Sequence, residues 1–258
     1  MIEWTDDAIV LSARRHGESA AIVSLLTRAH GRHAGLVPGG AGRRARGVYE
    51  PGNRVSASWR ARLSEHLGHY ACELAESRAA GLLDDALRLA GLSAATALVD
   101  AALPEREPHA RLFDSLDGLI ARLCAAPPGA AWAAHYVRFE LDLLAELGFG
   151  LDLGRCAATG RSDDLAFVSP KTGRAVSAAA AAPYRDRLLP LPGFLTHGAD
   201  AAAVPVEILL SGFRLTGFFL DRHVFAHQPV KDTERLPAAR DRLVRLLQRS
   251  ADRTAVAS

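Results

Sequence analysis

The chain has 258 residues, of which 49% are hydrophobic and 23% charged, and its formal net charge is +2. This composition excludes a globally disordered chain, and the length allows one large domain or two ordinary ones of roughly 100–200 residues each. Because the net charge is close to zero, only the distribution of charge along the chain can indicate a binding partner.

The first 80 residues carry the pattern of short β-strands separated by turns. Apolar residues that alternate with polar ones, or that form compact runs, predict strands over 9–14, 21–26, 31–37, 55–60 and 69–74. Glycine and proline at 17, 31, 38–40 and 51–52 mark the turns between these strands. Five strands in so short a segment favour a small closed barrel of the OB type over a sandwich.

Near Gly81 the pattern changes to the spacing of amphipathic helices. Helices are predicted from residue 82, over 112–123, over 130–147, over 206–225 and over 236–249. The segment 149–197 between them is rich in turn-forming residues and is predicted to be irregular. We therefore predict an α+β protein, with a five-stranded OB-fold barrel over 1–80 that binds nucleic acid and an α-helical domain over 81–258.

Positive charge is concentrated in the predicted barrel. From Arg14 to Arg62 there are ten arginines and two acids, a net charge of +8, so the rest of the chain is net −6. This asymmetry is typical of a surface that binds phosphates, because each arginine that neutralises a phosphate releases counterions. The alternative is a plain solvated face. The candidate binding residues are Arg14, Arg15, Arg28, Arg32, Arg43, Arg44, Arg46, Arg60 and Arg62.

Two features of this segment suggest how a nucleic acid would be held. Residues 39–47 are predicted to form a flexible loop that presents Arg43, Arg44 and Arg46 to a backbone. Tyr49 and Trp59 are candidates for stacking on bases. The competing interpretation of Trp59 is that its ring fills the barrel.

The order of several short segments resembles the RecO family of bacterial recombination mediators. These segments are DAIVL at 7–11, GES at 17–19, LTR at 26–28, HGR at 30–32, GRR at 42–44, EPG at 50–52, LGFGLDL at 147–153 and FVSPKTG at 167–173. The resemblance implies an OB-fold followed by a helical domain, and binding of single- and double-stranded DNA. It also implies annealing of complementary strands and help in loading the recombinase onto strands coated with single-strand-binding protein (SSB). The implied partners are RecR and the acidic C-terminal tail of SSB.

The chain departs from the family at a zinc site that some relatives carry in the central segment. Cys156 would open a Cys-x-x-Cys pair there, but Thr159 stands in the partner position. The second pair would fall near Ser177 and Ala180, which do not replace thiolates. Because a structural zinc site needs four nitrogen or sulfur ligands, we expect a degenerate zinc-finger-like segment and no cofactor.

Sequence features that mark compartment or catalysis point to a cytoplasmic protein that is not an enzyme, and the resemblance implies that it is associated with the nucleoid. Three widely spaced cysteines suggest a reducing compartment, and neither a signal peptide nor a membrane span is expected. His223 and His227 are four residues apart, but Val224 stands where a zinc protease needs glutamate. A hydrolase that uses these histidines therefore lacks a complete motif.

Two further alternatives concern the basic residues. The barrel arginines would serve equally in an RNA-binding OB-fold accessory factor, because backbone contacts do not distinguish the two polymers. The C-terminal arginines would dock an acidic tail, extend the DNA surface or simply form a solvated helix face. They are Arg235, Arg240, Arg242, Arg245 and Arg249.

Overall fold

A computed structural model describes residues 1–127, 129–196, 204–226 and 235–256. The chain divides into two units, Met1–Ala125 and Ala126–Ser258, and each is described by itself. The first unit contains a barrel and the helices that follow it as far as residue 125, so the boundary predicted near residue 80 lies inside this unit.

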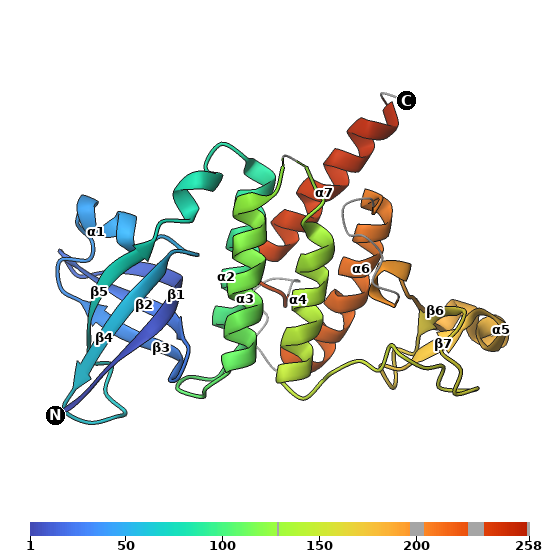
Figure 1. The fold of residues 1–258 in the computed structure, drawn as a ribbon, viewed down its shortest axis with the longest axis horizontal. Coiled ribbons are helices and arrows are strands. Elements are labelled where there is room, and N and C mark those ends of the chain that lie inside the picture. The colour runs from blue at the N-terminus through green and yellow to red at the C-terminus, as the bar shows by residue number, and fades with distance from the viewer. Residues whose placement is uncertain (128, 197–203, 227–234, 257–258) are drawn as a thin grey trace. The chain divides into compact units, whose positions relative to one another are not determined.

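The barrel consists of the five predicted strands, closed in the order β1-β2-β3-β5-β4 (Figure 1). Neighbouring strands are antiparallel, except that β3 and β5 are parallel. The strands are β1 (Ile2–His16), β2 (Ala20–Thr27), β3 (Gly31–Val37), β4 (Arg54–Ala61) and β5 (His69–Glu76). β1 begins well before its predicted start. The sequence did not predict this beginning, because its acidic residues obscure the alternation that places Trp4 and Asp6 toward the barrel.

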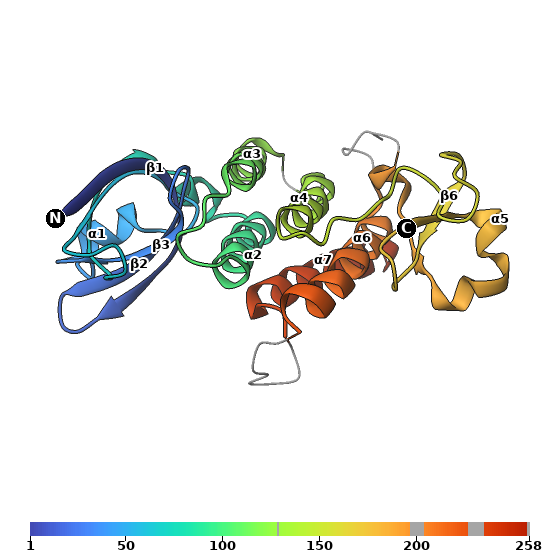
Figure 2. The ribbon, with the colours of Figure 1, turned by 90° about the horizontal axis from the view of Figure 1, so that it is seen from below.

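β1 closes the barrel because it pairs with two strands. Its residues 2–9 pair with β4 and its residues 8–16 pair with β2, and the strand curves as it passes from one to the other (Figure 2). The register with β2 shifts between Val10 and Ser12. At this shift the Val10 N–H donates to the Asn53 carbonyl at 2.9 Å, and the Gly52 N–H donates to the Val10 carbonyl at 2.8 Å.

Asn53 links three parts of the barrel through its buried side chain, which is 1% exposed. Its Nδ2 donates to the carbonyls of Gly47 at 2.8 Å and Val48 at 3.3 Å. Its Oδ1 accepts from the N–H groups of Arg78 at 2.9 Å and Ala79 at 3.2 Å. One amide therefore ties the start of β4 to the segment before it and to the residues that leave β5.

The predicted flexible loop over 39–47 is wrong in its second half. Residues from Arg43 form a short helix, α1 (Arg43–Val48). Ala45 and Val48 of this helix pack against the barrel core, and the carbonyls at its end accept hydrogen bonds from Asn53. Tertiary contacts, rather than helix propensity, therefore order the arginines of this segment.

Two helices complete the first unit, α2 (Ala86–Ala102) and α3 (Ala110–Ala125), preceded by the 3-10 turn η1 (Ala79–Leu82). The Asp85 carboxylate caps α2 by accepting from the N–H groups of Leu87 and Arg88. On the same helix, Asp100 accepts from the hydroxyls of Ser12 at 2.8 Å and Ser24 at 2.6 Å. These bonds attach α2 to β1 and β2.

In the second unit, α6 packs against both α4 and α7 (Figure 1). These helices are α4 (Ala133–Glu146), α6 (Val206–Phe219), extended by the π-helical turn η5 (Leu220–Val224), and α7 (Ala238–Val256), and they match the predicted helices. Among the described residues, no helix is both long enough and apolar enough to cross a membrane.

The central segment 149–197 is more regular than predicted, because it contains a three-stranded sheet in the order β7-β6-β8. The strands are β6 (Leu165–Val168), β7 (Ala175–Ser177) and β8 (Leu189–Pro190), and the short helices are α5 (Ala178–Ala181), η2 (Ala182–Arg187) and η3 (Gly193–Leu195). Strands of two to four residues are too short to produce a recognisable alternation.

A buried ion pair joins the three long helices of the second unit. Arg240 of α7 donates to Glu140 of α4 through Nε at 2.6 Å and Nη2 at 2.9 Å. Nη2 also donates to the Phe213 carbonyl of α6 at 2.8 Å, and the Thr216 hydroxyl donates to Glu140. The Arg240 side chain is 4% exposed and that of Glu140 is fully buried, so the prediction that Arg240 lies on a solvated or docking face is wrong.

We predict that Asn53→Leu destabilises the barrel by about 2–4 kcal/mol, because it leaves buried carbonyl and N–H groups without their partners. Hydrogen exchange of barrel peptides measures this loss. Ser58→Ala, which removes an exposed hydroxyl pair with Thr5, is the control and should change stability by less than ~0.5 kcal/mol. Equal protection in the two variants would contradict the role of Asn53.

We predict that Arg240→Met destabilises the second unit by about 3–5 kcal/mol, because it leaves the Glu140 carboxylate buried without its partner. Urea unfolding, with hydrogen exchange of α4, α6 and α7 peptides, measures the change. The double variant Glu140→Leu/Arg240→Met should recover most of the loss, since it removes both charges. A double variant no more stable than Arg240→Met would argue against this explanation.

Candidate nucleic-acid interface

Two of the nine candidate arginines form ion pairs with acids beyond the barrel strands. Arg28 donates to Asp114 of α3 at 2.7 Å, and this hydrogen bond raises the pKa of Arg28. Arg32 lies 3.6 Å from Asp100 and 3.5 Å from Glu105. These contacts attach the β2–β3 hairpin to the helices of the first unit, so Arg28 and Arg32 have a structural role.

Arg54 is engaged in the same way, by Asp7 at 3.0 Å and Asp117 at 3.4 Å. All the acids that neutralise Arg28, Arg32 and Arg54 lie outside the segment from Arg14 to Arg62. The charge of +8 counted along the sequence therefore overstates the charge available at the surface.

The other seven arginines of the segment are exposed, and within the described part of the chain none of them forms an ion pair. They are Arg14, Arg15, Arg43, Arg44, Arg46, Arg60 and Arg62. Without a carboxylate partner in the protein, their guanidinium groups can take phosphate oxygens as acceptors.

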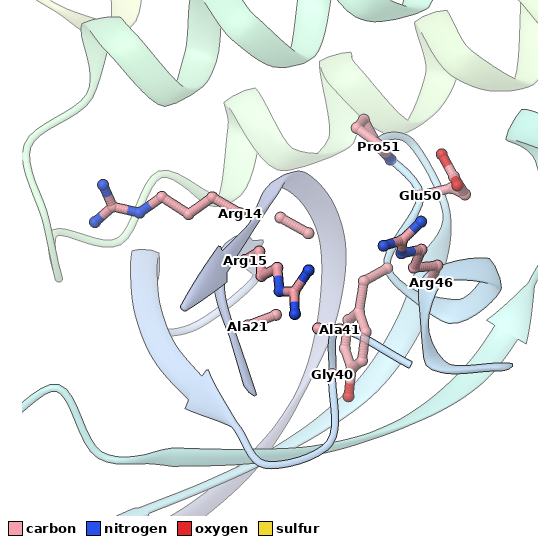
Figure 3. A pocket seen from close by; sticks show the side chains of 10 residues that line it. Arg14, Arg15, Ala21, Gly40, Ala41, Arg46, Glu50 and Pro51 are labelled. Carbon is pink, nitrogen blue, oxygen red and sulfur yellow. The ribbon is translucent and has the colours of Figure 1, made fainter. Parts of the chain in front are cut away.

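Arg14, Arg15 and Arg46 form a first basic group. They line a hollow of about 280 Å³ together with Glu50 and others. The Ala41 N–H donates to the Ser19 carbonyl at 2.9 Å, which brings the segment before α1 onto the β1–β2 turn. Figure 3 shows Arg15 and Arg46 directed toward the hollow, with Glu50 beside Arg46 and Arg14 extended away.

The shape of this hollow depends on local backbone contacts. Arg15 is held over its own turn, because Nη2 donates to the Glu18 carbonyl at 2.8 Å and Nε to the Gly17 carbonyl at 3.3 Å. Gly40 lies so close to the strands that a Cβ atom there would be 2.9 Å from the Ala21 Cβ. A larger residue at position 40 would displace the wall next to Arg46.

The second basic group lies where β1 begins. Arg60 and Arg62 line a hollow of about 270 Å³ together with His66, His69 and Met1. The first group lies near the opposite end of β1, beside Arg14 and Arg15. Arg14, Arg15 and Arg46 therefore line one hollow and Arg60 and Arg62 line another, a division that spacing along the sequence does not predict.

The two aromatic rings proposed for base stacking are both buried, which corrects that expectation. Trp59 is 1% exposed and its Nε1 donates to the Leu67 carbonyl at 3.0 Å. Tyr49 is 6% exposed and belongs to the barrel core, where burial raises the pKa of its hydroxyl well above the usual range. The competing interpretation, that Trp59 fills the barrel, is confirmed.

An exposed ring that the sequence analysis missed is that of His30. It stacks on Trp4 with centroids 4.0 Å apart and an interplanar angle of 7°. The stacking residues predicted from the sequence are tryptophan and tyrosine alone, and the Trp4–His30 contact joins residues 26 positions apart. In the sequence, His30 is a histidine before a turn glycine, and no pattern distinguishes it from a histidine that is simply solvated.

In the central segment, hydroxyl groups surround the Cys156 thiol. The Ser177 N–H donates to the Cys156 Sγ at 3.3 Å, and the two side chains are 3.5 Å apart. Burial opposes the thiolate, but hydrogen bonds from Ser177 and Thr159 outweigh it and lower the pKa of Cys156 to about 6. This set of groups does not fit zinc, and among the described residues no three His, Cys, Asp or Glu side chains group to hold a metal.

The remaining candidates are the two histidines and the C-terminal arginines. The His223 ring stacks on Phe149 at 5.0 Å and on Phe219 at 6.0 Å, whereas His227 lies outside the described residues. Arg235 lies 3.9 Å from Asp221, and Arg242, Arg245 and Arg249 are exposed on α7. A pairing of His223 and His227 in catalysis receives no support from these contacts.

Two protein-family models match the chain. The model described as "Recombination protein O N terminal" matches residues 1–78, and "Recombination protein O C terminal" matches residues 83–232. A protein from Rhodospirillum centenum named DNA repair protein RecO is 59% identical over 245 residues, which are 94% of each chain. Proteins of the same name from Rhodospirillum rubrum (49% over 257 residues; 98% of this chain, 100% of the relative) and Bradyrhizobium diazoefficiens (55% over 223; 86% and 88%) are also similar.

Proposed function

Because the chain belongs to the RecO family of DNA repair and recombination proteins, we propose that it binds DNA through its N-terminal barrel and acts without covalent chemistry. The observation that carries this proposal is the set of exposed arginines on the barrel that have no carboxylate partner among the described residues. Such groups bind the phosphates of DNA whatever its base sequence, which suits a protein that acts wherever DNA is damaged.

The barrel is proposed to be an OB-fold. Its strand order, β1-β2-β3-β5-β4 with parallel contact between β3 and β5, supports this assignment, as does the short helix α1 between β3 and β4. OB-folds bind oligonucleotides with the β1–β2 and β4–β5 loops beside the sheet. Arg14 and Arg15 precede the first of these loops, and Arg60 and Arg62 lie at the start of the second.

We propose that both single- and double-stranded DNA bind to these groups, since backbone contacts do not depend on pairing. A protein that neutralises the phosphates of two complementary strands lowers the repulsion between them, which would promote annealing. The family suggests two partners for loading of the recombinase, RecR and the acidic tail of SSB. It also suggests a cytoplasmic, nucleoid-associated location.

The central segment is proposed to keep its fold without zinc. Hydrogen bonds around Cys156 and the β7-β6-β8 sheet would take over the role that metal ligands have in other members. The Ala157 N–H, which donates to the Ala175 carbonyl at 2.7 Å, and the Ala175 N–H, which donates to the Asp152 carbonyl at 2.8 Å, tie this segment together.

We predict that Arg43→Ala/Arg44→Ala/Arg46→Ala weakens binding of labelled single-stranded DNA at least tenfold, because it removes three phosphate contacts. Fluorescence anisotropy at several salt concentrations measures both affinity and salt dependence. The slope of log affinity against log salt should fall by about 2, at roughly 0.7 per lost contact.

The matched control is Arg28→Ala/Arg32→Ala, which removes two arginines that are paired with acids. It should lower thermal stability and leave the salt slope near that of the wild type. Equal effects of the two variants on the slope would contradict the assignment of phosphate contacts to Arg43, Arg44 and Arg46. An RNA competitor of equal length that displaces the DNA more effectively than unlabelled DNA would favour the RNA-binding alternative.

Annealing provides an independent test of the proposed function. The wild type should accelerate the pairing of complementary oligonucleotides, measured by the quenching of a dye on one strand by a quencher on the other. The triple arginine variant should be slower by a factor similar to its loss of affinity. A wild-type protein that binds DNA but fails to anneal it at any salt concentration would restrict the function to binding.

A further inference from the structure

Aromatic rings form a continuous series from the interior of the barrel toward its surface. The innermost members, Tyr70, His33 and Trp59, are almost fully buried. His33 meets Trp59 edge to face at 4.8 Å, and Trp4 stacks near-parallel to Trp59 with centroids 5.5 Å apart. Burial, together with the charge of Arg106, lowers the pKa of His33 to about 4, so this ring is neutral and packs as an aromatic residue.

His30 is the outermost ring of the series and is fixed by its surroundings. Its ring lies 4.0 Å from that of Trp4, at an angle of 7°. Its Nδ1 lies 3.1 Å from Oδ2 of Asp6, and its backbone N–H donates to the Thr27 hydroxyl at 3.0 Å. The same carboxylate oxygen accepts from the Ala29 N–H at 2.7 Å. The turn that carries His30 and the ring itself are therefore both held in place.

Despite these contacts, 36% of the His30 side chain is exposed. Trp4 stacks on one face of the ring and the Asp6 carboxylate contacts Nδ1 at one edge, and among the described residues no second aromatic ring stacks on His30. A flat aromatic surface that is already ordered loses little conformational entropy when a second flat group stacks on it. Such surfaces take unstacked nucleobases, for which histidine is one of the usual partners.

The second basic group begins next to this series of rings. Trp4 pairs with Trp59 across β1 and β4, and Arg60 directly follows Trp59. The β4–β5 turn lies on Trp59 so closely that a Cβ atom at Gly68, which has a φ of +63°, would be 2.4 Å from the indole. A strand whose phosphates contact Arg60 and Arg62 would therefore have its bases near the same end of the barrel.

We propose that the exposed face of His30, supported by Trp4 and Trp59, stacks one unpaired nucleobase of single-stranded DNA. This inference rests on the proposed DNA-binding function and gives it a preference for unpaired strands. Bases inside a duplex are stacked on their neighbours and do not present a face to the ring. The platform therefore adds affinity for single strands alone, on top of the phosphate contacts.

The test compares binding of a labelled oligodeoxythymidine, an abasic strand of the same length and a duplex. The wild type should bind the oligodeoxythymidine about fivefold to tenfold more tightly than the abasic strand, the low end of the range for base–aromatic stacking. His30→Ala should abolish this ratio while its binding to the abasic strand and to the duplex stays unchanged. His30→Phe, which keeps an aromatic face, should retain the ratio.

The control is Tyr184→Ala, which removes a 59% exposed ring from the second unit and should leave all three affinities unchanged. A fall in affinity for all three ligands in His30→Ala would indicate damage to the barrel, and His30→Phe then decides the question: loss of the ratio there overturns the platform. Retention of the ratio in His30→Ala also overturns it while leaving the proposed function intact. A wild type that binds no strand at low salt overturns both.

Discussion

Closure of the barrel depends on β1 pairing with two different strands. If β1 ended after its contact with β4, the β1–β2 side would be open and Val10, Val23 and Leu25 would lose their shared core. The shift in register at Val10 lets one strand pair with both β2 and β4. The Val10 N–H and carbonyl groups form hydrogen bonds with the backbone of residues 53 and 52 instead. At the same place, the side chain of Asn53 donates hydrogen bonds to the carbonyls at the end of α1. The positions of Arg43, Arg44 and Arg46 thus depend on how β1 bends.

The acids of α2, of α3 and of the loop between them determine which arginines remain available for a ligand. Asp100, Glu105 and Asp114 take Arg28 and Arg32, and these contacts lie on the side of the barrel that faces the helices. Among the described residues, the exposed arginines near the ends of β1 and on α1 form no ion pair, although Glu50 lines the same hollow as Arg46, so their guanidinium groups face solvent or a phosphate. The Arg32 side chain is 19% exposed, so its carboxylates offset a cost of desolvation, whereas the Arg28–Asp114 pair lies at the surface and carries little such cost. Arginine therefore links the barrel to the helices at some positions and remains available to bind a ligand at others.

Period-two alternation predicted β1 and β4, a compact apolar run predicted β2, and the spacing of apolar residues predicted the long helices. The sequence did not predict α1, whose order comes from contacts with Asn53 and the core, nor β6 to β8, whose strands are too short. It counted Arg28 and Arg32 among the DNA-binding arginines and placed Arg240 on a solvated or docking face, because the acids that pair with them are distant in sequence. Charge counted along a segment does not reveal such partners. Glu140 fell within the apolar stripe of its helix, but only the fold shows that Arg240 faces it.

The separation of the two basic groups limits how a strand of DNA is bound. They lie near opposite ends of β1, and fifteen extended residues span at most about 50 Å. Because β1 curves round the barrel, the direct distance between the groups is shorter than this. A single strand that contacts both groups would place several nucleotides across the barrel, within the roughly 4–16 nucleotides typical of one OB-fold. Phosphates at the two ends would set the position of the strand, and a base beside the second basic group would then lie near the rings at the start of β1. Sequence-independent affinity and a preference for unpaired bases would thus come from different residues of one closed barrel.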